Sequence, residues 1–413
     1  MCFPLLDSGE KPPRCITTQA ETKLKGGNIG PDGQPECRNM RLLGHCNLGW
    51  RGDGMHINVK DGYAFFAHMG DNGIGTSVID VRDPEKPTLV TQIPVPSYTH
   101  SHKVQIVDDI LLVNYEQYGT GGQGQTGLKT FDVSNPREPR ELSFYHMPGR
   151  GTHRPTYWQN PYAYVSGSDE GWDHQFLITI DMTDPTQIKE VGRWWVPGQH
   201  VAGGERPDWV EQGLSYHLHH AIARGDRLYC GYWDAGFFIL DNSDPSSPQM
   251  LSHLQWSPDE SGETHSPVPM PGRDVLVLTD ECVRNECDDI VKQVRLIDIS
   301  DDRNPKVLST LPIPEGSFCE RGGRFGPHNV HEGRPGTLQD GNTVYLTYFN
   351  AGVRVYDISD ASKPREIAYF IPEAPQGRRT IQLNDILVAA DGLIYASDRF
   401  AGGLYIFELT GRS

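Results

Sequence analysis

Short stretches in which hydrophobic and polar residues alternate run through most of the chain, and each is about as long as a β-strand. In one representative segment they cover residues 102–107, 110–115, 127–133 and 141–147. Gly, Pro, Asn and Asp separate the stretches. Alternation with a period of two is typical of half-buried strands, and these separators form tight turns. Because helical periodicity is almost absent, the pattern predicts an all-β protein.

One phrase recurs six times along the chain: a strand-like run that ends in a hydrophobic residue and Asp, followed by a turn with a second Asp or Asn. The first aspartates of the copies are Asp80, Asp132, Asp181, Asp241, Asp298 and Asp357. The long and regular spacing between these aspartates indicates one supersecondary unit that stacks on its neighbours. Four antiparallel strands repeated radially form a β-propeller. We interpret the phrase itself as turn chemistry without a catalytic role.

A seventh, incomplete copy lies at the C-terminus, with strand-like runs at 386–389, 393–396 and 404–408. Its fourth strand is missing, and residues 40–46 supply a matching run before the first complete copy. A strand from the N-terminus would close the ring and remove exposed sheet edges. We therefore expect an all-β, seven-bladed β-propeller, closed by an N-terminal strand that completes the last blade. Residues 40–413 would form this single domain, and residues 1–39 an extended N-terminal arm.

Composition narrows the classes of partner. The formal net charge of −17 argues against a nucleic-acid partner, which needs a basic surface. No stretch is long and apolar enough to span a membrane, so we expect no membrane partner. We expect a small-molecule substrate and leave the oligomeric state open. The N-terminus lacks a secretory signal, which predicts a cytoplasmic protein, or a periplasmic one if a signal has been trimmed. Eight cysteines do not suggest a disulfide scaffold, and we expect Cys282 and Cys287 to be ordinary loop thiols.

Histidines follow the same repeat. Six copies place a histidine at the start of the strand that would line the central channel: His56, His102, His153, His219, His265 and His328. The loops that leave the second strands begin with acidic residues in several copies: Glu116, Asp169, Asp234 and Glu281. In a propeller these loops open on the same face as the starts of the inner strands. Imidazoles and carboxylates are therefore expected at one mouth of the channel.

Neutral imidazole is a favoured ligand for transition metals. We expect three or four of the six histidines to hold a transition metal, with Cu or Fe favoured and Zn or Mn possible. The four acidic residues would orient ligands or act as general bases. The alternative is one structural hydrogen-bonding histidine per blade, because a residue that recurs in a repeat is by default structural. Paired histidines such as His100 with His102, and His219 with His220, favour the metal site over that alternative.

The strand and turn phrases resemble a known family. Leu111-Leu112-Val113 and the run from Leu128 to Ser134 are similar to the LVIVD-repeat family of bacterial propeller proteins, over nearly all of residues 49–411. This resemblance implies the fold and names no reaction. A looser likeness links the channel histidines to metal-binding propellers such as the selenium-binding protein and methanethiol oxidase group, nitrous oxide reductase and the carotenoid cleavage oxygenases. Oligogalacturonate lyases are a further analogue, in which channel histidines hold a divalent ion.

Three functional hypotheses follow. The preferred one is a metalloenzyme, an oxidoreductase that acts on a small organic substrate. The second is a metal-dependent lyase or isomerase on a carboxylate or sugar-acid substrate, with Arg154 or Arg334 as the bidentate anchor of the carboxylate. The third is a non-catalytic binding or scaffold propeller in which the histidines are structural.

Overall fold

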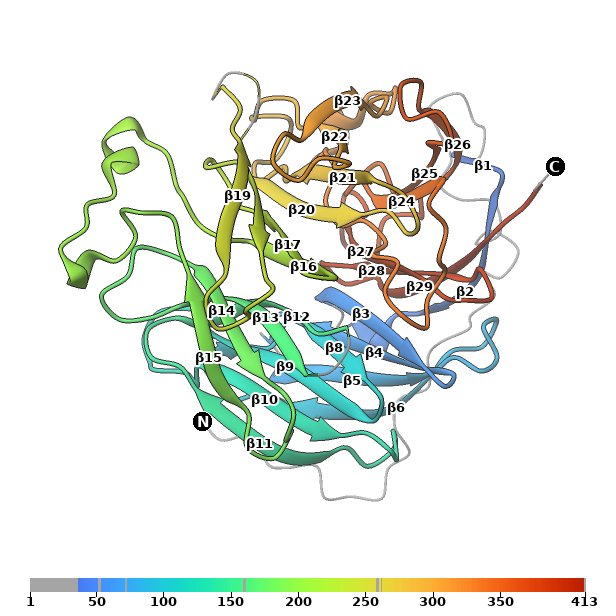
Figure 1. The fold of residues 1–413 in the computed structure, drawn as a ribbon. Coiled ribbons are helices and arrows are strands. Elements are labelled where there is room, and N and C mark those ends of the chain that lie inside the picture. The colour runs from blue at the N-terminus through green and yellow to red at the C-terminus, as the bar shows by residue number, and fades with distance from the viewer. Residues whose placement is uncertain are drawn as a thin grey trace.

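The computed structural model describes residues 36–411, apart from 51–52, 71–72, 159–160, 258–259 and 261. This part of the chain is an all-β propeller, with antiparallel sheets arranged around a central axis (Figure 1). Its helical elements are short 3-10 turns: η1 (Leu48–Trp50), η2 (Val201–Gly203), η3 (Asp208–Gln212) and η4 (Phe318–Arg321). None of the helices described is long and apolar enough to cross a membrane.

Strand pairing groups the described strands into successive antiparallel units around the ring. The first unit holds β3 (Gly54–Lys60), β4 (Tyr63–His68), β5 (Ile74–Asp80) and β6 (Thr88–Pro94). The second holds β7 (Thr99–His100), β8 (Val104–Val107), β9 (Ile110–Gln117), β10 (Gly127–Asp132) and β11 (Arg140–His146). The third holds β12 (Gly151–Thr156), β13 (Tyr162–Ser168), β14 (Phe176–Asp181) and β15 (Lys189–Trp194). The fourth holds β16 (His220–Arg224), β17 (Arg227–Gly231), β18 (Phe237–Asp241) and β19 (Gln249–Leu254).

The fifth unit holds β20 (Thr264–Pro269), β21 (Val275–Asp280), β22 (Val294–Asp298) and β23 (Lys306–Thr310). The sixth holds β24 (Thr343–Thr347), β25 (Val353–Asp357) and β26 (Arg365–Phe370), and its innermost segment is an irregular stretch joined by a single bridge from Val330 to Leu346. The last holds β27 (Leu383–Val388), β28 (Ile394–Asp398) and β29 (Gly403–Leu409). This grouping agrees with the spacing of the repeats in the sequence.

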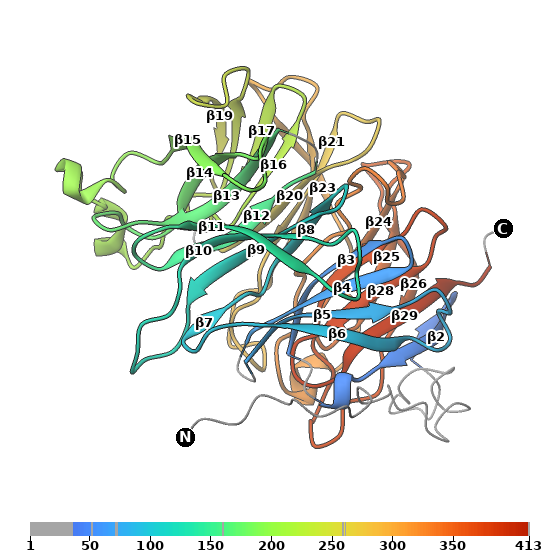
Figure 2. The same cartoon turned by 90° about the horizontal axis from the view of Figure 1, so that it is seen from below.

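An N-terminal strand closes the ring, as predicted. Strand β2 (Met40–Cys46) pairs antiparallel with β29, so Met40 lies opposite Leu409 and Cys46 opposite Leu404. Figures 1 and 2 both show β2 in blue beside β29 in red. A second short strand, β1 (Cys37–Arg38), pairs with the outer edge of β26. The rest of the predicted N-terminal arm, residues 1–35, lies outside the described residues.

The recurring aspartate phrase forms the turn between the third and fourth strands, which explains its repetition. In each copy the carboxylate of the first aspartate accepts a hydrogen bond from the backbone N–H two residues on, as from Ser134 to Asp132 at 2.9 Å. A β-bulge lies just before each of these aspartates. Bulges increase the local twist of a strand. The phrase is therefore structural in the six copies.

A second set of bulges, in the inner strands, determines which side chains line the channel mouth. In four units a register shift leaves one inner-strand residue without a partner on the second strand: Met55, His153, His265 and Asn384. The residue that follows each of them is paired with the second strand. Successive strand residues face opposite sides, so a shift of one position changes what a side chain contacts.

The cysteine prediction was wrong in one respect. Cys287 is not a free loop thiol, because it forms a disulfide with Cys319, with a Cα–Cα distance of 5.4 Å. Cys46 is also disulfide-bonded. Cys282, the neighbour that we expected to behave like Cys287, is a free and buried thiol. Cys287 lies between β21 and β22 and Cys319 lies in η4, after β23, and such a pairing between distant loops is not visible in the spacing of the cysteines.

Candidate metal centre at the channel mouth

Five of the six predicted histidines form a continuous arc of rings at one mouth of the channel. The centroid distances between neighbouring rings are 4.6 Å (His102 to His153), 5.2 Å (His153 to His219), 3.5 Å (His219 to His265) and 4.6 Å (His265 to His328). His100 extends the arc, with its ring 4.2 Å from that of His102. The repeat thus brings together imidazoles that are far apart in the sequence.

His56 is the exception, and its predicted place in the ring was wrong. The inner-strand bulge of the first unit falls on Met55, so His56 takes the following position, which Arg154 occupies in the third unit. The backbone N–H of Val104 donates to His56 Nδ1 at 3.3 Å, which leaves the proton on Nε2. That nitrogen lies 3.7 Å from Asp385 Oδ2. His56 therefore belongs to a deeper layer of the channel.

Two clusters at the mouth have the composition of a metal site, and each contains two histidines and one glutamate. They are His100, His102 and Glu116, and His265, Glu281 and His328; within each cluster the candidate ligand atoms lie within 4.8 Å of one another. Two histidines and a carboxylate are the donor set of many non-haem iron sites. The hydrogen bonds around the two clusters distinguish them.

The cluster of His265, Glu281 and His328 leaves its imidazole nitrogens available. His328 donates its Nδ1–H to the backbone carbonyl of Asn384 at 2.5 Å, so Nε2 carries the lone pair and lies 3.5 Å from Glu281 Oε1. His265 Nδ1 lies 2.8 Å from the Ser266 hydroxyl. Its Nε2 is buried without a hydrogen-bond partner among the described residues and lies 3.4 Å from Glu281 Oε2. Outer partners of this kind orient metal-binding histidines.

Electrostatics at this cluster favour the metal-binding forms of all three groups. Burial lowers the pKa of His265 and His328, although Glu281 opposes the shift. Burial alone would raise the pKa of Glu281, but His265, His328 and Arg324 outweigh it and hold that pKa well below its ordinary value. Near pH 7 the cluster therefore contains two neutral imidazoles and a carboxylate, the states that bind a cation.

In the cluster around Glu116 the carboxylate is instead held by hydrogen bonds with histidines, although His100 Nδ1 and His102 Nε2 are buried without a partner among the described residues. Glu116 Oε2 lies 2.9 Å from His100 Nε2 and 2.8 Å from His153 Nδ1. Asn114 accepts from the backbone N–H of Lys103, and this fixes its amide so that Nδ2 donates to His102 Nδ1 at 3.1 Å. His102 then carries its proton on Nε2, the atom that faces Glu116 at 4.0 Å. This arrangement suits a hydrogen-bonding network better than a metal.

Three other predicted site residues lie away from the mouth cluster. Asp169 pairs with Arg193 at 2.9 Å, and Asp234 accepts from the backbone N–H of Ser215 at 2.8 Å. Arg154 is buried and forms an ion pair with Glu332. Asp169 and Asp234 thus have partners of their own, whereas Nε and Nη1 of Arg154 are buried without a hydrogen-bond partner among the described residues. The roles that the sequence suggested for these three residues stay predictions.

The layer below the histidine arc is a buried network of charges. Asp385 accepts from the backbone N–H of Ile57 and from the Asn329 side chain, both at 2.8 Å. Burial raises the pKa of Asp385, and burial together with Arg154 lowers the pKa of Lys103. Arg334, the second anchor suggested by the sequence, donates to Gln105 at 3.3 Å within this layer. Such a network fixes the centre of the propeller.

Two arginines at the mouth were missed in the sequence. Arg324 donates to Glu281 Oε1 at 2.9 Å, and its guanidinium lies over the Phe349 ring at 5.5 Å. Arg399 lies over the same ring at 5.7 Å. Arg399 directly follows Asp398, the last residue of β28, and so begins a loop that leaves a second strand. This position in the sequence could have identified Arg399 as a residue of the channel mouth.

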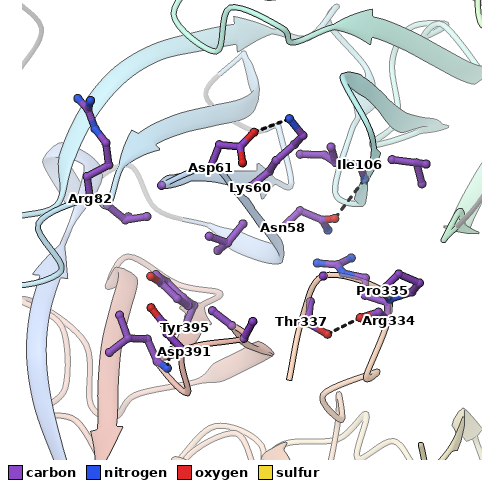
Figure 3. A pocket seen from close by; sticks show the side chains of 18 of the residues that line it. Asn58, Lys60, Asp61, Arg82, Ile106, Arg334, Pro335, Thr337, Asp391 and Tyr395 are labelled. Carbon is purple, nitrogen blue, oxygen red and sulfur yellow. Dashed lines mark hydrogen bonds and ion pairs between the residues drawn. The ribbon is translucent and has the colours of Figure 1, made fainter. Parts of the chain in front are cut away.

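A cavity lies at the opposite end of the channel. It has a volume of about 1050 Å³ and is lined by the far ends of β3 and β8 and by the loop from Arg334 to Thr337 (Figure 3). Lys60 on its rim pairs with Asp61 at 2.6 Å and Asp109 at 2.8 Å. The histidines mark the other ends of the inner strands, so this cavity and the candidate metal centre are separate.

Comparison with known proteins agrees with the fold. The family model for the LVIVD repeat matches residues 51–94 and 222–254. No curated protein matches the sequence. The structure is similar to the β-propeller domain of Myceliophteria thermophila Cps50 (Swd1), with a TM-score of 0.56, 11% identity and coverage of 87% of this chain and 98% of that one.

A second similar structure is the periplasmic gluconolactonase PpgL of Pseudomonas aeruginosa, with a TM-score of 0.55, 13% identity and coverage of 83% of this chain and 95% of that one. Chaetomium thermophilum Raptor matches with a TM-score of 0.56 and 10% identity over 92% of this chain and 31% of that one. At these identities the likeness concerns the fold. The chain is therefore a β-propeller protein in which two segments match the model of the LVIVD repeat.

Proposed function

We propose that the protein is a metal-dependent enzyme that binds a divalent transition metal through His265, Glu281 and His328. The observation that carries this proposal is the buried, unpartnered Nε2 of His265 beside Glu281 and the Nε2 of His328. A buried polar atom without a partner is costly, and a metal ion would satisfy it. The outer contacts of His328 and His265, with the Asn384 carbonyl and the Ser266 hydroxyl, support the same assignment.

The donor set favours iron among the metals considered. Two imidazoles and one carboxylate suit Fe(II), whereas Cu is more often bound by nitrogen and sulfur donors. Three protein ligands leave coordination positions open for a substrate, and such open sites are typical of catalytic metals. We therefore propose oxidoreductase chemistry on a small organic substrate.

Residues other than the three ligands would also support the metal site. Arg324 donates to Glu281 and so fixes the carboxylate beside the two histidines. His219 stacks on His265 with a centroid distance of 3.5 Å and an interplanar angle of 21°. This stacking holds the imidazole plane of His265. Rigid support of this kind is what a catalytic metal site requires.

Metal analysis of untagged protein tests the proposal. Protein loaded with Fe(II) without oxygen should retain about one equivalent after desalting, and Glu281→Gln should retain much less. Metal below about 0.2 equivalents, with no gain in melting temperature on addition of Fe, Cu, Zn or Mn, would contradict both enzyme hypotheses. It would leave the binding or scaffold alternative.

The lyase or isomerase alternative uses the same site. It differs in metal requirement, because acidification of a proton beside a carboxylate needs a Lewis acid and no change of oxidation state. Zn-loaded or Mn-loaded protein would then support turnover as well as Fe-loaded protein. A paramagnetic centre that changes oxidation state during turnover would favour the oxidoreductase.

A further inference from the structure

The loop after β28 buries a guanidinium at the channel mouth without a partner for one of its nitrogens. Arg399 Nη1 is buried and has no hydrogen-bond partner among the described residues. Asp398 is not available to it, because that carboxylate accepts four backbone N–H groups, from Gln382, Phe400, Ala401 and Gly402. A buried charge is stable only when it is paired and hydrogen-bonded. Arg399 therefore lacks a hydrogen-bonding partner that a buried guanidinium is expected to have.

A second guanidinium lies close to the first. Arg324 and Arg399 lie over the same Phe349 ring, at 5.5 Å and 5.7 Å. The backbone of Arg324 is held by the Gln382 amide, with hydrogen bonds of 2.9 Å and 3.1 Å. Burial and the charge of Arg324 lower the pKa of Arg399 to about 10. Burial and a neighbouring like charge both disfavour the charged form of Arg399, and a bound anion would stabilise it.

The arginine pair adjoins the candidate metal centre. The Phe349 ring lies 4.9 Å from the ring of His328. Arg324 donates to Glu281, which also faces both histidines of that centre. Glu281 is thus the carboxylate shared by the two features, and it already accepts a hydrogen bond from Arg324. A further negative group is needed at Arg399.

We propose that Arg399, together with Arg324, binds the carboxylate of a small organic acid beside the metal centre. A guanidinium presents paired N–H donors that match the two oxygens of a carboxylate. This inference rests on the proposed function for the metal and adds the class of substrate. Arg154, the anchor suggested by the sequence, pairs with Glu332 in the deeper layer of the channel.

Calorimetric titration of metal-free protein with oxalate tests the arginine pair independently of the metal. The protein is kept in EDTA, and sodium chloride holds the ionic strength constant. We expect oxalate to bind, and Arg399→Gln to weaken its affinity about tenfold or more, because a hydrogen-bonded charge pair is lost. Arg379→Gln is the matched control, since that side chain is 72% exposed, and it should leave the affinity unchanged. No binding to the parent protein, or equal affinity in Arg399→Gln, would overturn the proposal.

The melting temperature of the same variant gives a second readout. Removal of an incompletely paired buried charge should leave the melting temperature of Arg399→Gln unchanged or raise it. A fall of several degrees would mean that Arg399 already has a structural partner and would overturn the proposal. If oxalate binding depends on Arg399 but no metal is retained, the anion site stands and the proposed metalloenzyme fails. If metal is retained but the affinity for oxalate does not depend on Arg399, the proposed metalloenzyme stands and the anion site fails.

Discussion

His328 donates its Nδ1–H to the backbone carbonyl of Asn384 at 2.5 Å, across the contact between the sixth and last units of the propeller. This bond determines the tautomer, so the lone pair on Nε2 faces Glu281 at 3.5 Å. At His102 the opposite holds, because the Asn114 amide donates to Nδ1 and leaves a proton on Nε2. Two histidines at equivalent positions of the repeat are therefore prepared for different roles.

This difference predicts opposite effects of two alanine substitutions. His328→Ala should lower the affinity for Fe(II) by tenfold or more, about 1.4 kcal/mol, because a ligand is removed. His102→Ala should retain the metal, since His102 belongs to the hydrogen-bonded network around Glu116. Metal content after dialysis, with circular dichroism as the control for folding, measures both. Equal metal loss in the two variants would show that the whole arc binds metal.

The fold was predictable from the sequence because it depends on properties that every copy repeats. Alternation, turn residues and period determine a propeller, and the incomplete last copy pointed to β2 as its missing strand. The site was only partly predictable. Alignment by histidine placed His56 in the ring, but the bulge falls on Met55, and no feature of the sequence marks which of two adjacent residues is left unpaired. The roles of Arg399 and Asn114 depend on contacts between distant loops.

The displaced position of His56 can be tested by stability rather than by metal. Its Nδ1 accepts the backbone N–H of Val104 at 3.3 Å. His56→Ala would leave that N–H buried without an acceptor, which costs about 1–3 kcal/mol of unfolding free energy. Metal content should not change. Urea denaturation and metal analysis of the same preparation measure the two effects, and a stable variant that has lost its metal would restore His56 to the ring.

The ion pair of Arg154 and Glu332 should be strongly coupled. Arg154→Met leaves the Glu332 charge buried without its partner, so we expect a loss of about 3–5 kcal/mol of unfolding free energy. The double variant Arg154→Met with Glu332→Leu should recover most of that loss, because no unpaired charge remains. The exposed pair of Arg365 and Asp357 is the control, and its disruption should cost about 1 kcal/mol or less. Additive losses in the Arg154 cycle would contradict the coupling.

Stability should fall between pH 6.5 and pH 4. Burial lowers the pKa of His45 and of His331 to about 4. In this window the unfolded chain therefore binds more protons than the folded chain. The contribution of the two neutral histidines to the free energy of unfolding is complete above pH 6.5 and is lost as the pH falls through 4. We expect a loss of about 2 kcal/mol per group between pH 7 and pH 5.

Denaturant unfolding at several pH values, compared between variants, isolates one of these groups. His331→Gln should reduce the pH-dependent loss of unfolding free energy by the amount that one histidine contributes. His174→Gln should not, because that side chain is 48% exposed. An unchanged slope in His331→Gln would mean that His331 titrates normally in the folded protein.

The disulfide between Cys287 and Cys319 should contribute measurably to stability. It closes a loop with a sequence separation of 32 residues, for which constraint of the unfolded chain predicts about 4 kcal/mol. The double variant Cys287→Ser with Cys319→Ser should lose about that amount in non-reducing buffer, whereas Cys282→Ser serves as the control for a cysteine that forms no disulfide. In dithiothreitol the parent protein and the double variant should converge.

The same bond bears on where the protein works. Disulfides persist in oxidising compartments and are rare in the cytosol. From the Cys287–Cys319 bond we therefore predict that the protein works in an oxidising compartment, such as the periplasm. Trapping of free thiols in intact cells, followed by mass spectrometry of the peptides that contain Cys287 and Cys319, measures the state directly. Both thiols should be protected until reduction, and complete labelling before reduction would place the protein in a reducing compartment.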